Sequence, residues 1–134
     1  MNRVFPAVKA IIQNGEKFLV IKQAFAGKTV WDLPGGRVDY GESPYDTLVR
    51  EVMEETHLSI NIIKPIGFFW FFRFDGDQVV CTTFLCNADN YEIDITKNPA
   101  DENIGEFRWV TKEEFLGDEF TVSDDSMKKL FALL

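Results

Sequence analysis

The chain has 134 residues, of which 46% are hydrophobic and 14% aromatic, and this composition fits one folded domain over residues 1–134 rather than a disordered or collagen-like chain. Its 14 Lys and Arg stand against 22 Asp and Glu, for a formal net charge of −8. This balance argues against polymeric nucleic acid as a partner, because polyanion binding depends on clustered Lys and Arg. A small anionic substrate is compatible with it where a metal ion reverses the local charge.

Signals for the cellular compartment are few and consistent. The most apolar segment, residues 66–72, is about a third of the roughly 20 residues that span a bilayer, and the N-terminus has no signal-peptide pattern. Cys81 and Cys86 lie five positions apart in an expected strand, so they should face opposite sides, roughly 16 Å apart, and form no disulfide. These features predict a reduced, cytoplasmic protein with no membrane partner.

In chain order, the first expected element is a β-hairpin over residues 4–23 with Asn14-Gly15 as its turn, because both residues tolerate positive φ. Residues 24–41, which are rich in glycine, are predicted to form a loop. A helix is expected over residues 43–56, with Ser43 as N-cap and a proline at the first helical position. Its apolar stripe is expected to comprise Tyr45, Leu48, Val49, Val52 and Met53.

Downstream of this helix, apolar runs alternate with polar ones. Strands are expected over residues 58–63, 67–74, 78–86 and 107–110. The polar segment 87–105 predicts a long loop that can include a short edge strand at 91–95. Thr111 is expected to cap a short helix and Ser123 to open a C-terminal one. One mixed α/β (α+β) domain follows from this order.

Acidic side chains are concentrated on the 43–56 helix. At about 100° per residue, Glu51, Glu54 and Glu55 fall within an arc of about 100°, where three carboxylates repel one another. A solvated acidic face is the plain explanation of such a cluster. The neighbouring Arg50 and the tight backbone at Pro34-Gly35-Gly36 instead favour an oxygen-rich site for a hard divalent cation such as Mg²⁺.

A longer pattern surrounds this helix. Gly36 is followed after five residues by Glu42, and after seven more by the run Arg50-Glu51-Val52-Met53-Glu54-Glu55-Thr56-His57-Leu58. This spacing over 23 positions resembles the signature of the Nudix (MutT-type) hydrolases, whose fold is a mixed β-sheet sandwiched between helices. His57 stands where the signature has glycine. We expect a left-handed helix terminus there, which His adopts at modest strain.

The resemblance implies a reaction in which water attacks a diphosphate linkage of a nucleoside diphosphate joined to another moiety. It implies Mg²⁺ or Mn²⁺ as cofactor and a small nucleotide as substrate, and it makes a homodimer a further expectation because dimers are common in the family. By position, Glu51, Glu54, Glu55 and the Gly35 carbonyl would ligate metal, Arg50 would orient the glutamates, and Glu42 would support them or an additional ion.

The general base and the substrate contacts are less constrained. The base is expected on the signature helix, as Glu54, or in the acidic loop before residue 107, where Glu102 is favoured and Glu106 is the alternative. Arg37, beside the glycine pair, is the first candidate for a phosphate contact. Further candidates are Phe25, Trp31, Trp70 and Phe72 for stacking on a nucleobase, and Lys22 and Arg73 for phosphates.

Rival functions are weaker. Gly27-Lys28-Thr29 has the form of a P-loop end, but Lys22 stands where the first glycine of that motif belongs. A sensing module that has the same fold and no turnover is the main alternative. An isomerase of prenyl diphosphates would need a cysteine placed over the substrate, and neither cysteine lies in a matching motif. We therefore predict a hydrolase of nucleoside triphosphates or related nucleotides.

Overall fold

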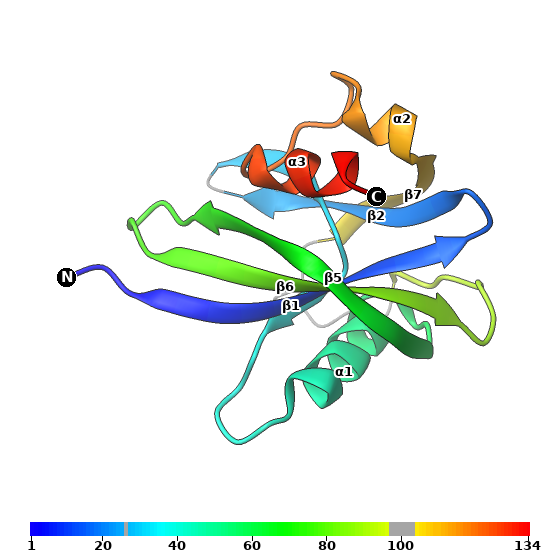
Figure 1. The fold of residues 1–134 in the computed structure, drawn as a ribbon, viewed down its shortest axis with the longest axis horizontal. Helices are drawn as coiled ribbons and strands as arrows, with labels where there is room; N and C mark the ends of the chain where they lie inside the picture. Colours follow the sequence, from blue (N-terminus) through cyan, green and yellow to red (C-terminus); the bar gives the residue numbers. More distant parts are fainter. Residues whose placement is uncertain (26, 97–103) are drawn as a thin grey trace.

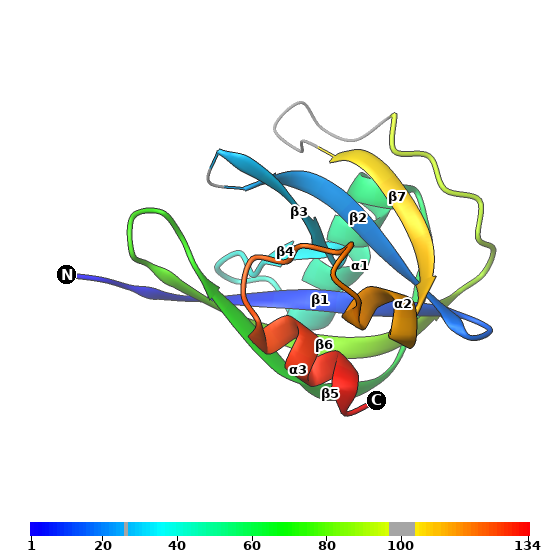
Figure 2. The same ribbon diagram turned by 90° about the horizontal axis from the view of Figure 1, so that it is seen from above.

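The computed structural model describes residues 1–25, 27–96 and 104–134. The elements in these ranges are β1 (Val4–Asn14), β2 (Lys17–Phe25), β3 (Lys28–Asp32), β4 (Gly35–Arg37), α1 (Pro44–Thr56), β5 (Ile60–Phe72), β6 (Gln78–Ala88), β7 (Ile104–Thr111), α2 (Lys112–Leu116) and α3 (Ser126–Ala132). Helix α1 covers one side of the strands, and α2 and α3 cover the other (Figures 1 and 2). This arrangement confirms the expected fold class.

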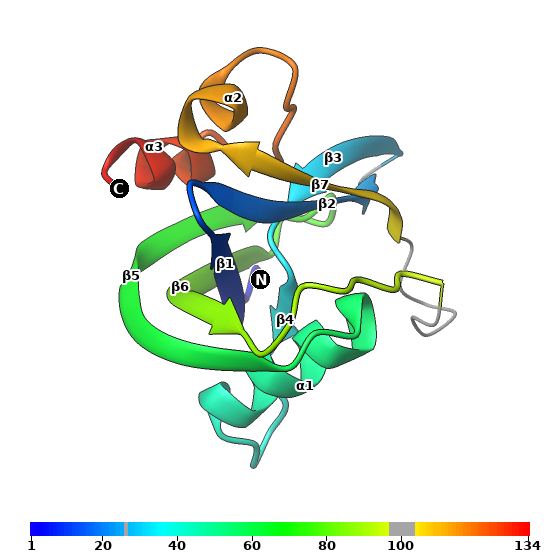
Figure 3. The same cartoon turned by 90° about the vertical axis from the view of Figure 1, so that its right-hand side faces the viewer.

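The strands form two layers that share the β1–β2 hairpin. In one layer β1 lies between β4 and β6, and β5 pairs with the far edge of β6; in the other, β2 lies between β3 and β7. Strands β1 and β2 pair through Gln13–Phe18 and Asn14–Lys17, next to their turn, and then diverge (Figure 3). The two layers are therefore joined near this turn and separate from each other away from it.

Two apolar clusters stabilise this arrangement. The larger lies between the two layers and beneath α2 and α3, and includes Phe69, Phe115 and Phe131. The smaller lies between the β1 layer and α1. Cys81 belongs to the larger cluster and Cys86 to the smaller, and both are free thiols. The prediction that they face opposite sides without a disulfide is confirmed.

The hairpin turn differs by one residue from the expected one. Because Asn14 pairs with Lys17, the central turn residues are Gly15 and Glu16 rather than Asn14 and Gly15. Gly15 has φ +64°, the sign that a type II′ turn requires at its first central position. The prediction of a hairpin is confirmed, and the predicted register of its turn is wrong.

Three segments were expected to have other secondary structure. Residues 24–41 contain β3 and β4 instead of a continuous loop, because these strands pair with β2 and β1. The strands expected over 58–63 and 67–74 are one strand, β5, whose pairing with β6 shifts at two bulges. No strand forms at 91–95; the Tyr91 hydroxyl donates to the Gln13 carbonyl oxygen at 2.8 Å instead.

Both C-terminal helices form. Helix α2 has the expected capping box, in which the Thr111 hydroxyl accepts from the Glu114 amide. Helix α3 begins three residues later than predicted, at Ser126, whose amide donates to Asp124. The Ser126 hydroxyl donates to the Trp70 carbonyl at 2.8 Å and accepts from the Trp70 amide at 2.9 Å, which ties α3 to the edge of β5. No helix in the described part of the chain is long and apolar enough to span a membrane.

Helix α1 begins as expected, since the Ser43 hydroxyl accepts a hydrogen bond from the Tyr45 amide. Its buried apolar stripe is narrower than predicted. Leu48 and Val52 are fully buried, whereas Tyr45, Val49 and Met53 are exposed. The helix packs against β1 and β4 and turns part of its acidic face inward.

The end of α1 has the left-handed conformation that the sequence predicts. His57 has φ 66° and ψ 17°, and its amide donates to the Met53 carbonyl. It is the single non-glycine residue with positive φ in the described ranges. Its side chain is exposed, so the conformation rather than a side-chain contact is what this position requires.

We expect His57→Gly to raise the free energy of unfolding by about 1 kcal/mol, because glycine adopts positive φ without the steric cost that a Cβ imposes. His57→Ala keeps the Cβ and should give no gain. Denaturant unfolding of the three proteins measures both changes. A loss of stability in the glycine variant would contradict this account of the helix terminus.

Candidate active site

Arg50 lies at the centre of a group of carboxylates, here called the Arg50 cluster: Asp39, Glu42, Glu51 and Glu54. Its Nη1 donates to Glu51 Oε1 at 3.3 Å and to Glu54 Oε1 at 3.1 Å. Its Nε and Nη2 donate to the two oxygens of Glu42 at 3.0 and 2.9 Å, and Nη2 also donates to Asp39 at 3.2 Å. One guanidinium therefore holds four acids together.

These contacts shift the protonation of Glu42. The hydrogen bonds from Arg50 and then from the Thr47 hydroxyl lower the pKa of Glu42 to about 2, against a smaller opposing effect of burial. The hydrogen bond to Glu42 is also the largest cause that raises the pKa of Arg50. Glu42 is thus a carboxylate held ionised beside the helix, as its expected supporting role requires.

Glu55 and Glu51 lie against the backbone of β4. Glu55 is 2% exposed, and its Oε1 accepts from the Gly35 amide at 2.7 Å. A Cβ added to Gly36 would lie 2.6 Å from the Glu51 carboxyl carbon, closer than side chains pack. A side chain at position 36 would therefore displace the Glu51 carboxylate from its place beside β4.

The chemistry of this donor set fits a hard divalent cation, which prefers carboxylate and carbonyl oxygens. The carboxylates do not form a coordination shell in this arrangement: across residues 1–25, 27–96 and 104–134, no three His, Cys, Asp or Glu side chains converge to hold an ion. Glu51 and Glu54 instead share the positive charge of Arg50. The space that Gly36 leaves open accommodates the Glu51 carboxylate.

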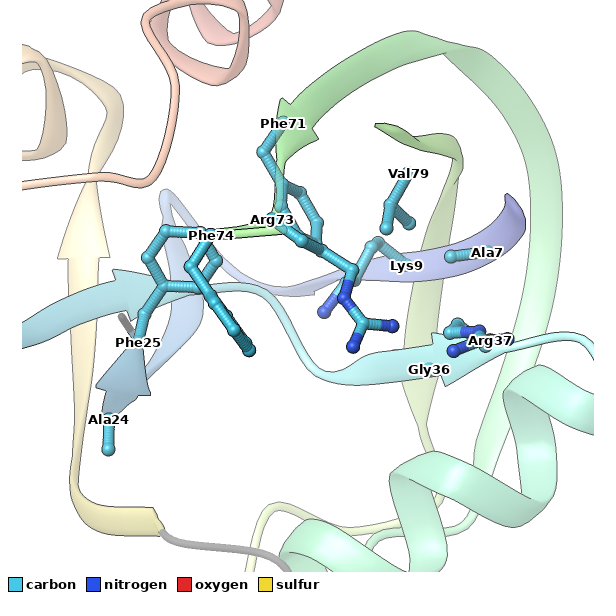
Figure 4. Close-up of a pocket in the computed structure, with 10 residues that line it drawn as sticks. All are labelled: Ala7, Lys9, Ala24, Phe25, Gly36, Arg37, Phe71, Arg73, Phe74 and Val79. Carbon is cyan, nitrogen blue, oxygen red and sulfur yellow. The ribbon is translucent and has the colours of Figure 1, made fainter. Parts of the chain in front are cut away.

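A cavity of about 310 Å³ lies on the other side of β4, where the two strand layers diverge. It is lined by Ala7, Lys9, Ala24, Phe25, Gly36, Arg37, Phe71, Arg73, Phe74 and Val79. Phe25 meets Phe71 edge to face with ring centroids 5.4 Å apart, and Phe25 and Phe74 stand at one side with Arg37 at the other (Figure 4). We call this cavity the aromatic–cationic pocket.

Lys9, Phe71 and Phe74 line this pocket and were not among the candidates from the sequence; Lys9 is the charged one of the three. It is 6% exposed, and its Nζ donates to Asp32 Oδ2 at 2.9 Å and to the Leu33 carbonyl at 3.2 Å. Burial disfavours its charge, but Asp32, with smaller contributions from Cys81 and Glu55, outweighs burial and raises its pKa. The available signal was a lysine in the middle of an apolar strand.

The structure separates the predicted substrate residues into two groups. Phe25, Arg37 and Arg73 line the pocket, and the Arg37 guanidinium lies 3.8 Å from the centre of the Phe5 ring. Trp31 does not line it. It is 5% exposed in the larger cluster, with its ring 5.3 Å from that of Phe120. This burial disfavours its stacking on a nucleobase, which stays a prediction.

The remaining candidates lie elsewhere. Trp70 and Phe72 are 42% and 53% exposed, and neither lines the pocket. Glu102 lies outside the described residues, so its predicted role as base stays a prediction. Glu106 forms ion pairs with Arg108 at 3.1 Å and with Lys22 at 4.0 Å.

Comparison with known proteins identifies the family. The model of the NUDIX domain matches residues 4–133. The chain belongs to the Nudix family. Its Nudix fold is similar to that of a MutT protein from Methanosarcina mazei Go1, with 25% sequence identity and a TM-score of 0.83, over 98% of this chain and 93% of that one.

The regions that match this chain cover a smaller share of its curated Nudix relatives than of the M. mazei protein. Phosphatase NudJ of Escherichia coli (strain K12) is 30% identical over 110 residues, which cover 81% of this chain and 69% of NudJ. A putative 8-oxo-dGTP diphosphatase of Bacillus subtilis (strain 168) is 35% identical over 68 residues, 51% of this chain and 44% of that protein. The match with the Nudix hydrolase YvcI of the same organism covers 61% of YvcI, so this chain matches less than two thirds of the length of both B. subtilis proteins.

Proposed function

We propose that this chain is a metal-dependent hydrolase that cleaves a diphosphate linkage in a nucleoside triphosphate or related nucleotide. The observation that carries the proposal is the position of Gly36. This residue lines the aromatic–cationic pocket and also borders the Glu51 carboxylate. A nucleotide whose base occupies the pocket can therefore extend its phosphates past β4 toward the carboxylates of α1.

Glu51, Glu54 and Glu55 would hold Mg²⁺ or Mn²⁺, with the Gly35 carbonyl as a further ligand. When bound, such an ion neutralises phosphate oxygens and lowers the pKa of a water molecule. The hydrogen bond from the Gly35 amide fixes Glu55. Arg50 keeps Glu51 and Glu54 close together before the ion arrives, and Glu42 fixes Arg50 in turn.

Glu54 is the proposed acceptor of the proton from the attacking water. Its side chain is 36% exposed, against 14% for Glu51, and Glu55 is 2% exposed, so Glu54 is the member of the trio most accessible to water and substrate. Proton transfer to a carboxylate placed beside the water is general-base catalysis. Glu102 is the alternative base on the sequence pattern alone.

The pocket matches the two chemical parts of a nucleotide. Aromatic rings of Phe25, Phe71 and Phe74 offer faces and edges for a base, while Arg37 and Arg73 offer guanidinium groups that bind phosphate in a bidentate manner. Its volume of about 310 Å³ lies at the lower end of ligand pockets, as expected for one base rather than two. The similarity to the phosphatase NudJ and to the putative 8-oxo-dGTP diphosphatase of B. subtilis supports a small phosphate compound as substrate.

The test is a panel of nucleoside triphosphates, nucleoside diphosphate sugars and dinucleoside polyphosphates, assayed for released phosphate and pyrophosphate with Mg²⁺, with Mn²⁺ and with EDTA. We expect metal-dependent turnover of at least one compound. Tight binding of a compound without turnover of any would favour the sensing module instead. The homodimer and the cytoplasmic location stay predictions; light scattering on the purified chain, whose mass is 15.4 kDa, measures the former.

A further inference from the structure

A buried ion pair lies under the aromatic–cationic pocket. The side chains of Lys9 and Asp32 are 7% and 10% exposed, with their charged atoms 2.9 Å apart. Asp32 also accepts from the Gln23 side-chain amide at 2.9 Å and from the Leu33 amide at 2.7 Å. Asp32 is thus held by three donors, and its position fixes that of the Lys9 ammonium.

The Lys9 ammonium has hydrogen-bonding capacity left. It carries three N–H groups, and within the described residues its hydrogen bonds go to two acceptors, Asp32 and the Leu33 carbonyl. Lys9 lines the pocket, and its side chain extends from β1 toward the space between Phe74 and Arg37 (Figure 4). The third N–H is therefore available to a ligand there.

A buried ion pair stabilises a fold little more than well-packed apolar residues of similar volume would at the same positions. Strand β1 carries apolar side chains on either side of Lys9, at Val8 and Ala10, each at most 2% exposed. An apolar residue would fit the same strand face between Ala7 and Ile11. Recognition of a ligand by the ammonium accounts for a charge at this position.

From this geometry we propose that Lys9 selects nucleobases that carry a carbonyl oxygen at the position where adenine and cytosine carry an amino group. Guanine and uracil present such an acceptor, whereas adenine and cytosine present an amino donor at the corresponding position. The Lys9 ammonium can donate a hydrogen bond to the carbonyl oxygen of guanine or uracil, whereas the amino group of adenine or cytosine is itself a donor. The proposal rests on the proposed function only in taking the pocket as the site of the base.

Equilibrium binding without metal tests this directly. Binding of GMP, AMP, UMP and CMP to the chain is measured by calorimetry in EDTA, so that the result does not depend on turnover. We expect GMP to bind more tightly than AMP, and UMP more tightly than CMP, by about 10-fold or more, since a site built to donate to an acceptor rejects an analogue that lacks it. Equal binding within each pair, or no binding of any of the four, overturns the proposal.

Variants separate recognition from folding. Lys9→Met alone leaves the buried Asp32 carboxylate without its ammonium partner and can unfold the chain, so Lys9→Met with Asp32→Asn removes both charges together. We expect this double variant to bind GMP and AMP within about 3-fold of each other, through loss of GMP affinity. Lys128→Met, which removes a lysine bonded to the Gly117 carbonyl on the surface, should keep the wild-type preference. A folded double variant that retains the preference overturns the role of Lys9.

If the preference is present and no compound of the panel turns over, the proposed hydrolase fails and the selectivity stands. If turnover is present and the two bases of each pair bind equally, the hydrolase stands and the selectivity fails. Measured with substrates that turn over, the same preference should appear in kcat/KM, and Lys9 should influence KM more than kcat, because it contacts the base rather than the reacting phosphate.

Discussion

Glu54→Gln should lower kcat by about 10²–10⁴-fold, because it removes a side chain proposed both to bind the metal and to accept the proton. Glutamine keeps the size of the side chain and its carbonyl oxygen but cannot take a proton from water. The fold should be retained, since the Glu54 side chain is 36% exposed and its contact in the Arg50 cluster is one of several. Steady-state kinetics with saturating Mg²⁺ measures the first effect, and circular dichroism with denaturant unfolding measures the second.

Glu113→Gln is the matched control for this experiment. Glu113 is an exposed glutamate in the first turn of α2, so the same change of charge there should leave kcat within about 2-fold of the wild-type value. A Glu54→Gln variant with near-normal kcat at saturating metal would contradict both roles assigned to Glu54. It would also move the general base to the acidic loop that contains Glu102.

Arg50→Met should reduce both activity and stability, because it leaves the carboxylates of the Arg50 cluster close together without their shared cation. Hydrogen bonds to charged groups contribute about 1.5–3 kcal/mol each, and partial exposure of this guanidinium, 35%, reduces their net value, so we expect a loss of about 2 kcal/mol in the free energy of unfolding at pH 7. Arg50→Lys should recover only part of this loss, because an ammonium cannot form the bidentate contact with Glu42. Turnover should fall at least 10-fold in Arg50→Met.

The loss of stability should depend on pH in a defined direction. The pKa of Glu42 falls from its ordinary value of 4.5 to about 2 in the folded chain, so Glu42 contributes stability above about pH 4.5 that is lost progressively as the pH falls toward 2. In Arg50→Met the main cause of this shift is absent. The difference in unfolding free energy between the wild type and Arg50→Met should therefore narrow between pH 4.5 and pH 2.

Denaturant unfolding in EDTA at pH 7 and at pH 3 measures this difference, with metal excluded so that ion binding does not contribute. Arg108→Met provides the control, because Arg108 also pairs with two glutamates, Glu106 and Glu119, but on the surface of β7. That variant should lose little stability at either pH. An Arg50→Met variant that is as stable as the wild type at pH 7 would show that the cluster is not held by Arg50.

The carboxylate centre could be predicted from the sequence because it depends on local geometry. Helix periodicity places Glu51, Glu54 and Glu55 together once the helix is recognised, and Ser43 and His57 mark its two ends. The contact between Gly36 and Glu51 exists only once β4 has formed. The spacing of the two residues in the sequence nevertheless belongs to a recognisable pattern. Local rules therefore identified the part of the site that lies on one helix and the strand beside it.

The pocket could not be predicted in the same way, because its lining residues come from β1, β2, β4, β5 and β6 and from the β5–β6 turn. Strand β3 forms a hairpin with β2 and β4 pairs with the distant β1, and this long-range pairing orders a glycine-rich segment. Trp31, in the same segment, is buried in the larger cluster. The role of Lys9 depends on Asp32, which is 23 residues later in the sequence and forms a hydrogen bond with it only in the folded chain. Side chains that approach over such distances leave no periodic signal in the sequence.

The two free thiols lie on opposite sides of the β1 layer, so local opening of each side can be measured separately. Burial raises the pKa of Cys81 and of Cys86 to about 12, so each thiol becomes reactive only when its own surroundings open. Cys81 is covered by the cluster under α2 and α3, beside Lys9, and Cys86 by the cluster under α1. Their labelling rates would therefore report local opening of the ligand side and of the carboxylate side of the same sheet independently, without any introduced probe.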